Sequence, residues 1–245
     1  MLEQGEYTFQ ANGLALWYKV SGSGPICVAP TPGWGVSSDL FFHTLNRLED
    51  HLTMVYLDTR GTGRSEKPAT ANDYTYELFA ADLDALRRHL GQERILVMGH
   101  SQAGIHAMTY ALSYPEHCAG LILVGAIAAF DEQYHEDVQR NMMARQNEPW
   151  FEQAFAVINS GDDPQTDEEF GRYCMSIMPF YLVDQEIATR YAPAFEATTF
   201  SVAAQKGQEA VQLDVNLLPD LHKINVPTLL AVGSEDFVCS PLQSE

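Results

Sequence analysis

A serine between small residues occurs in the run Gly99-His100-Ser101-Gln102-Ala103-Gly104. The apolar run 95–98 before it predicts a buried strand, and helically spaced apolar residues after it predict a helix. On such a turn the serine hydroxyl rises above the sheet, and small neighbours permit the strained backbone. We therefore expect Ser101 to be a nucleophile for acyl transfer. The N–H of Gln102, at the start of the helix, is one expected oxyanion donor.

A second motif is Leu57-Asp58-Thr59-Arg60-Gly61-Thr62-Gly63-Arg64-Ser65. It resembles the D-x-R-G-x-G-x-S loop of proline iminopeptidase-like α/β-hydrolases, which are peptidase family S33-like serine hydrolases. With the run around Ser101 and the later Gly233-Ser234-Glu235-Asp236, the resemblance covers nearly the whole chain apart from a helical insertion. The usual G-x-S-x-G pattern is modified here, because Ala103 replaces the second glycine and Gly104 follows it. Asp58 and Arg60 are expected to brace their loop.

The second oxyanion donor is expected from the loop that follows the third strand. Relatives carry H-G-G-P-G there, whereas this chain has Thr31-Pro32-Gly33-Trp34-Gly35. Aligning the two runs puts Gly33 at the donor position, and Trp34 is the nearby substitute because Pro32 has no N–H. Thr31 replaces the histidine of the motif, so the loop must be supported differently. A plain Gly/Pro turn is the alternative interpretation.

The resemblance also implies that Asp236 is the acid of a catalytic triad, with Glu235 as second choice. Such an acid fixes the tautomer of a histidine and stabilises its protonated form. Without Ser101, a solvated loop aspartate would be the default interpretation of Asp236.

A base is missing from this arrangement. In the family, the triad histidine follows the acid by one more strand, but only residues 237–245 follow Asp236. The eight histidines are His43, His51, His89, His100, His106, His117, His135 and His222. His100 is expected to point away from Ser101, and His135 is the one placed where it could reach. We expect the histidine, with a last strand and helix, to lie beyond Glu245. Residues 1–245 alone should then be nearly inactive, with the strand at 228–232 as an exposed apolar edge.

The substrate is less constrained. Serine rather than aspartate at the turn argues against epoxide hydrolase and dehalogenase chemistry, and two hypotheses remain. One is a serine hydrolase cleaving small esters or N-terminal aminoacyl (prolyl-type) amides; the other is a non-catalytic small-molecule binding protein or an inactive fragment. A free N-terminal amine would need carboxylates in the insertion, and the candidates are Glu186, Glu196, Asp184 and 167–169. Apolar residues that could line a pocket, or form only the core of the insertion, are Trp150, Phe151, Phe155, Met178, Phe180 and Tyr181.

Alternating strand and helix patterns indicate a mostly parallel sheet with helices on both faces, which is the α/β-hydrolase fold class. Asn12-Gly13 predicts a hairpin turn, and the helical spacing of 79–90 predicts a helix that ends at Gly91. Buried strands are predicted at 26–29, 54–57, 95–98 and 121–124, and the sheet is expected to resume with a strand at 226–232. We expect a core at 1–128, a helical cap at 129–217 and the continued, truncated core at 218–245.

The formal net charge of −19 disfavours nucleic-acid and membrane-surface partners, so we expect a small-molecule or short-peptide substrate. Cys27, Cys118, Cys174 and Cys239 are far apart, which indicates reduced thiols and a cytoplasmic protein. No motif indicates a metal or a cofactor.

Overall fold

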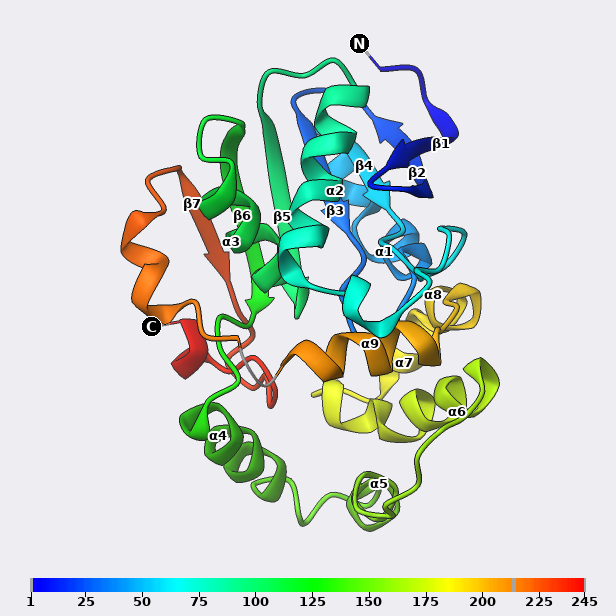
Figure 1. Cartoon of the computed structure of the whole chain (residues 1–245). Helices are drawn as coiled ribbons and strands as arrows, with labels where there is room; N and C mark the ends of the chain where they lie inside the picture. Colours follow the sequence, from blue (N-terminus) through cyan, green and yellow to red (C-terminus); the bar gives the residue numbers. More distant parts are fainter. Residues whose placement is uncertain (1, 213–214, 245) are drawn as a thin grey trace.

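The computed structural model describes residues 2–212 and 215–244 and is built around a mostly parallel seven-stranded sheet (Figure 1). The strand order is β1-β2-β4-β3-β5-β6-β7, with antiparallel pairing of β1 with β2 and of β2 with β4. The strands are β1 Gly5–Ala11, β2 Leu14–Gly22, β3 Ile26–Pro30, β4 Thr53–Leu57, β5 Ile95–Ser101, β6 Cys118–Ala126 and β7 Thr228–Ala231. Each predicted strand is confirmed, and so is the hairpin, because Asn12 and Gly13 have the positive φ angles that its turn requires.

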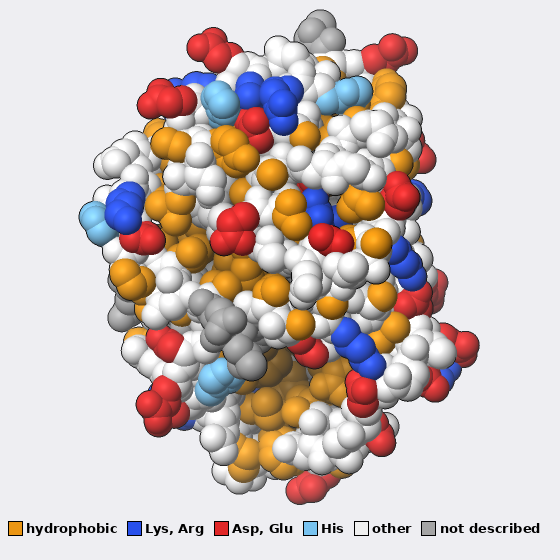
Figure 2. Space-filling model, viewed as in Figure 1, with side chains coloured by type: hydrophobic (Ala, Val, Ile, Leu, Met, Phe, Trp, Pro, Cys, Tyr) orange, Lys and Arg blue, Asp and Glu red, His pale blue; other side chains and the backbone are white. Residues whose placement is uncertain are grey.

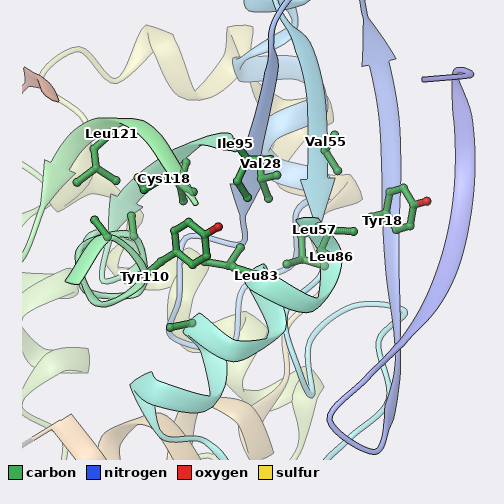
Figure 3. Close-up of a cluster of buried hydrophobic side chains, with 14 of the residues drawn as sticks. Tyr18, Val28, Val55, Leu57, Leu83, Leu86, Ile95, Tyr110, Cys118 and Leu121 are labelled. Atoms are coloured by element: carbon green, nitrogen blue, oxygen red, sulfur yellow. The ribbon is translucent and has the colours of Figure 1, made fainter. Parts of the chain in front are cut away.

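Helices cover both faces of the sheet. One face carries α2 (Tyr76–His89) and α3 (Ala103–Ser113), and the other carries α1 (Asp39–Thr44) and the 3₁₀ turn η1 (Asn46–Asp50). Figure 3 shows the core beneath α2 and α3, where Leu83, Leu86 and Tyr110 pack against strand residues such as Val28 and Val55. The apolar spacing of α2 thus buries one helix face against the sheet, as the sequence predicts.

The chain between β6 and β7 forms helices, and from α4 to α9 it lies across the carboxyl ends of the strands, whereas its last turn, η4, packs beside α3 (Figure 1). The elements are α4 Glu132–Met143, α5 Phe151–Ile158, α6 Asp167–Ile177, η3 Met178–Tyr181, α7 Glu186–Arg190, α8 Ala192–Ala197, α9 Val202–Gln212 and η4 Leu218–Lys223. Besides η1, the 3₁₀ turns η2 Ala71–Asp73 and η5 Pro241–Ser244 lie outside this stretch. Ala129 and Asn216 form an isolated β-bridge, so the two ends of the helical stretch meet. The exact boundaries 129 and 217 of a separate cap stay a prediction.

The last strand, β7, lies at the edge of the sheet beside β6. Leu229 and Leu230 point to opposite faces, and they are 60% and 53% exposed. This edge is therefore as open and apolar as the sequence predicts. Among the described residues, no helix has the length and apolar character needed to cross a membrane.

Candidate active site

Ser101 is the last residue of β5 and lies two residues before the start of α3. Its φ is +57°, a left-handed conformation that residues with a side chain rarely adopt. The neighbouring glycines leave the necessary room. A Cβ at Gly99 would lie 2.6 Å from the Ala103 carbonyl oxygen, and a Cβ at Gly104 would lie 2.5 Å from the Ala126 Cβ. The turn therefore tolerates Ala103 in the motif because the close approach falls on Gly104.

The N-terminus of α3 faces the region of Ser101. Gln102 directly precedes this helix, so its N–H is one of the first-turn donors that have no partner within the helix. The helix dipole favours negative charge at this end. Ser101 and the Gln102 N–H thus come together as the sequence predicts, in an arrangement able to stabilise an oxyanion.

The loop after β3 is docked directly on this turn. The N–H of Ala103 donates to the Pro32 carbonyl at 3.2 Å. Three successive residues, Gly33, Trp34 and Gly35, have φ of +94°, +50° and +72°. A Cβ at Gly33 would lie 2.8 Å from Gln102 Cβ, and a φ of +94° is itself one that residues with a side chain rarely adopt, so glycine suits this position. The loop therefore lies beside Ser101, at the position predicted from the sequence for the second oxyanion donor.

The N–H of Trp34 is already in use. It donates to Gln102 Oε1 at 2.7 Å and to Gln208 Oε1 at 2.8 Å. Gln102 Nε2 in turn donates to the Tyr76 hydroxyl at 3.2 Å. Of the two expected donors in this loop, Gly33 is therefore better suited than Trp34. The role of Gln208 has no signal in the sequence, because it lies on α9, far along the chain.

Thr31, which replaces the histidine of the family motif, supports the loop through hydroxyl contacts. Its Oγ1 lies 2.6 Å from Thr59 Oγ1, and Thr59 also contacts Thr62 Oγ1 at 3.2 Å. All three threonines are buried. The two loops that the sequence singled out are therefore joined by a chain of hydroxyl groups.

The loop 58–65 is braced as expected. Asp58 is fully buried and accepts hydrogen bonds from Ser38 N and Oγ and from Arg64 N and Nε. Arg60 is buried as well and forms a bidentate ion pair with Asp82, with both N–O distances at 2.8 Å. Neither side chain lines the cavity beside Ser101. Their contacts fit a structural role.

Asp236 lies in the loop after β7 and borders the same cavity as Ser101. Its Oδ1 accepts from Val238 N at 3.0 Å and from Cys239 N at 2.8 Å. Its Oδ2 lies so close to Gly125 that a Cβ on that glycine would be only 3.0 Å away. The carboxylate is thus held in a fixed orientation, as a triad acid must be. Its neighbour Glu235 is exposed and lines the cavity from the same loop.

A cavity of about 600 Å³ lies beneath the helical stretch, with Ser101, Asp236 and Gly33 in its lining. Its apolar lining residues include Ile177, Met178, Phe180, Tyr181, Phe195 and Phe200. On the face shown in Figure 2, hydrophobic side chains line a hollow beneath α9. Of the apolar residues suggested by the sequence, Met178, Phe180 and Tyr181 line the cavity. Phe151 and Phe155 lie outside the lining, in an apolar cluster that also contains the cavity residue Phe180, and Trp150 lines a neighbouring groove.

Cys239 is a neighbour of Ser101 that sequence reasoning missed. Its Sγ lies 4.0 Å from Ser101 Oγ, and the residue is 3% exposed. Burial, together with the charge of Asp236, raises the pKa of this thiol well above its ordinary value. The thiol is therefore protonated at neutral pH and cannot serve as the base for Ser101.

The eight histidines do not include one that joins Ser101 to Asp236. His100 lines the cavity, but its ring packs edge-on against Phe41 on the other side of the strand. Burial lowers its pKa, and the charge of Asp236 opposes that effect. His135 lies exposed on α4 and is outside the cavity lining, so the placement considered for it from the sequence is wrong.

The other histidines lie elsewhere. His89 contacts the Tyr18 hydroxyl, His117 pairs with Asp84, and His106 is buried in α3. His43, His51 and His222 are exposed and lie outside the cavity lining. Within residues 2–212 and 215–244, no cluster of three or more His, Cys, Asp or Glu side chains could hold a metal ion.

Comparisons with known proteins identify the fold family of this chain. Residues 31–245 match the family described as alpha/beta hydrolase fold. A proline iminopeptidase, PfmaB of Pestalotiopsis fici, is 25% identical over 96% of this chain and 84% of its own length.

Two solved structures share the fold. An alpha/beta fold family hydrolase from Bacillus anthracis has a TM-score of 0.79 and 18% identity, over 98% of this chain and 86% of its own. An esterase from Exiguobacterium antarcticum has a TM-score of 0.67 and 22% identity, over 97% of this chain and 84% of its own. Because the family match spans most of the chain, this protein is a proline iminopeptidase-like member of the alpha/beta hydrolase fold family.

Proposed function

We propose that this protein is a serine hydrolase that cleaves a small ester or an N-terminal aminoacyl amide through an acyl-enzyme on Ser101. The Ser101 hydroxyl attacks the carbonyl carbon while its proton passes to an imidazole oriented by Asp236. The oxyanion accepts hydrogen bonds from the N–H groups of Gln102 and Gly33. The leaving group departs with the proton, and water then releases the acyl group from Ser101.

One observation carries this proposal. Ser101 is held at a φ of +57° at the N-terminus of α3, and it borders an apolar cavity that Asp236 also borders. A non-glycine residue in the left-handed region is costly, by about 1–3 kcal/mol, and is retained where the surrounding structure enforces it. The absence of a Cβ at Gly99 and Gly104 leaves the room that this conformation needs. This placement gives the hydroxyl access to a substrate carbonyl that a buried serine on a regular strand lacks.

The proposal requires an imidazole between Ser101 and Asp236. The described residues place none there. Ser101 Oγ lies 4.0 Å from Cys239 Sγ, and Asp236 Oδ1 accepts hydrogen bonds from two backbone N–H groups. Removal of the histidine from such a triad costs about 10⁶ in kcat. Hydrolysis by residues 1–245 alone is therefore expected to be far slower than hydrolysis by a form in which an imidazole occupies this position.

The test is hydrolysis of p-nitrophenyl acetate and butyrate by the natural full-length protein and by two variants. Ser101→Ala should abolish turnover, and Ser160→Ala should not change it, because Ser160 is exposed at the end of α5, outside the cavity lining. Circular dichroism checks that both variants are folded. Turnover that persists in folded Ser101→Ala would refute Ser101 as the nucleophile.

A second candidate function is small-molecule binding without catalysis. The observation that favours it is the same missing imidazole among the described residues. It predicts that short esters bind in the cavity, that neither Ser101→Ala nor the parent protein turns them over, and that both bind them equally. Measurable Ser101-dependent turnover by the natural protein excludes this alternative.

A further inference from the structure

The cavity beside Ser101 contains few charged groups. Its lining includes two carboxylates, Glu235 and Asp236, and contains no lysine or arginine among the described residues. The remaining walls are mainly aromatic and aliphatic side chains from α6, η3 and α8. Such a lining suits an apolar group and provides little to compensate a charge.

Neither carboxylate is well placed to bind a cation. Asp236 Oδ1 already accepts two backbone N–H groups, and the proposed function assigns this carboxylate to the imidazole. Glu235 is exposed, and its carbonyl oxygen accepts a hydrogen bond from Arg145 Nη2. Its carboxylate is open to solvent, and water screens the attraction that an exposed carboxylate exerts on a cation. Within the described lining, an ammonium group buried among the apolar side chains would therefore have only this solvated carboxylate to pair with.

The carboxylates considered from the sequence as binders of a free amine lie elsewhere. None of Asp184, Glu186, Glu196 or 167–169 lines the cavity. Several have other partners: Asp167 Oδ1 accepts from Val202 N, and Glu168 pairs with Arg172. Glu169 caps the start of α6. Asp167, Glu168 and Glu169 thus have partners within the helical layer, outside the cavity lining.

A substrate with a free N-terminal amine is a cation at pH 7. Burial of an ammonium without a partner carries a large desolvation penalty, so it opposes binding and reaction. We infer that the cavity accepts neutral acyl groups with an apolar body and rejects acyl groups that carry a free amine. The inference rests on the proposed function and narrows its substrate to neutral esters, in place of prolyl-type amides.

The test uses two substrates of the same shape. Methyl cyclopentanecarboxylate and proline methyl ester differ by a ring CH₂ in place of the ring amine. Hydrolysis by the natural full-length protein is followed in a pH-stat. At pH 7 the kcat/KM of the neutral ester should be about a hundredfold higher than that of the proline ester. The ratio should shrink as rising pH deprotonates the amine. A higher kcat/KM for the proline ester would overturn the inference.

Matched variants test the cause of the preference. Met178 lines the cavity and is half-buried, so Met178→Glu adds a carboxylate of similar length and Met178→Gln adds the uncharged control. Met178→Glu should raise the relative kcat/KM for the proline ester, and Met178→Gln should leave the ratio unchanged. If the parent prefers the proline ester and Glu235→Gln removes that preference, Glu235 binds the amine and the inference is wrong.

The inference and the proposed function can fail separately. If neither ester is hydrolysed in a Ser101-dependent way, the proposed function is wrong. The cavity is then judged by calorimetric binding of cyclopentanecarboxamide and prolinamide to the same protein at pH 7. Tighter binding of cyclopentanecarboxamide supports the inference, and equal or tighter binding of prolinamide overturns it.

Discussion

His106 should make the fold sensitive to mild acid. The residue lies on α3, is fully buried and stacks on Phe79 with a ring separation of 4.1 Å. Neither ring nitrogen has a hydrogen-bond partner among the described residues. Burial lowers the pKa of His106 from its ordinary value of 6.5 to about 3.

The direction of the effect follows from linkage. The unfolded chain binds the proton more readily than the folded one. The free energy of unfolding therefore has its full value above pH 6.5 and decreases as the pH falls toward 3. At about 1.4 kcal/mol per pKa unit, the two pKa values give a loss of about 2 kcal/mol at pH 5 and about 3 kcal/mol at pH 4.

The perturbation is His106→Phe, which keeps a ring beside Phe79 and removes the titrating group. Urea unfolding at pH 7, 6 and 5 measures the free energy of unfolding of the parent, of His106→Phe and of the control His51→Gln. His51 is exposed, so its removal should leave the pH dependence unchanged. His106→Phe should lose less stability than the parent between pH 7 and 5, by about 2 kcal/mol. An identical pH dependence in His106→Phe and the parent would refute the reasoning.

Three further predictions concern the site and its supports. Gln102→Met removes one of the two acceptors of the Trp34 N–H, so kcat should fall by about tenfold with little change in KM, because the oxyanion loop is less fixed; an unchanged kcat in steady-state kinetics would contradict this. Gly104→Ala should destabilise the protein by about 1–3 kcal/mol through overpacking against Ala126, and Ala126→Gly should restore part of the loss in urea unfolding. Asp82→Ala should cost about 3–5 kcal/mol, because it leaves the buried guanidinium of Arg60 without its partner; a loss under 1 kcal/mol would show that the pair contributes little.

Local patterns were enough to predict the sheet and the turn at Ser101. A parallel strand buried on both faces is a continuous apolar run, so β3, β4, β5 and β6 are visible in the sequence. The turn at 99–104 depends on small residues within a few positions of Ser101, and these are visible as well. Asp236 needed the family resemblance, because a lone loop aspartate has no distinguishing local pattern.

Contacts made by the helical layer could not be predicted in the same way. Gln208 of α9 accepts the Trp34 N–H, and Cys239 lies beside Ser101, across long separations in the chain. Helical periodicity tells which face of α9 is apolar, but not which loop that helix covers. The same limit applies to the carboxylates of the layer, whose positions outside the cavity emerge only from the packing of α6, α7 and α8.

The central claim is that Ser101 forms an acyl-enzyme. The most direct measurement is intact-mass spectrometry of the natural full-length protein after brief exposure to p-nitrophenyl butyrate and after fluorophosphonate treatment, followed by peptide mapping. We expect a single adduct from each reagent, on Ser101, and none in folded Ser101→Ala. An adduct on another residue, or turnover of the ester with no Ser101 adduct under either reagent, would contradict it.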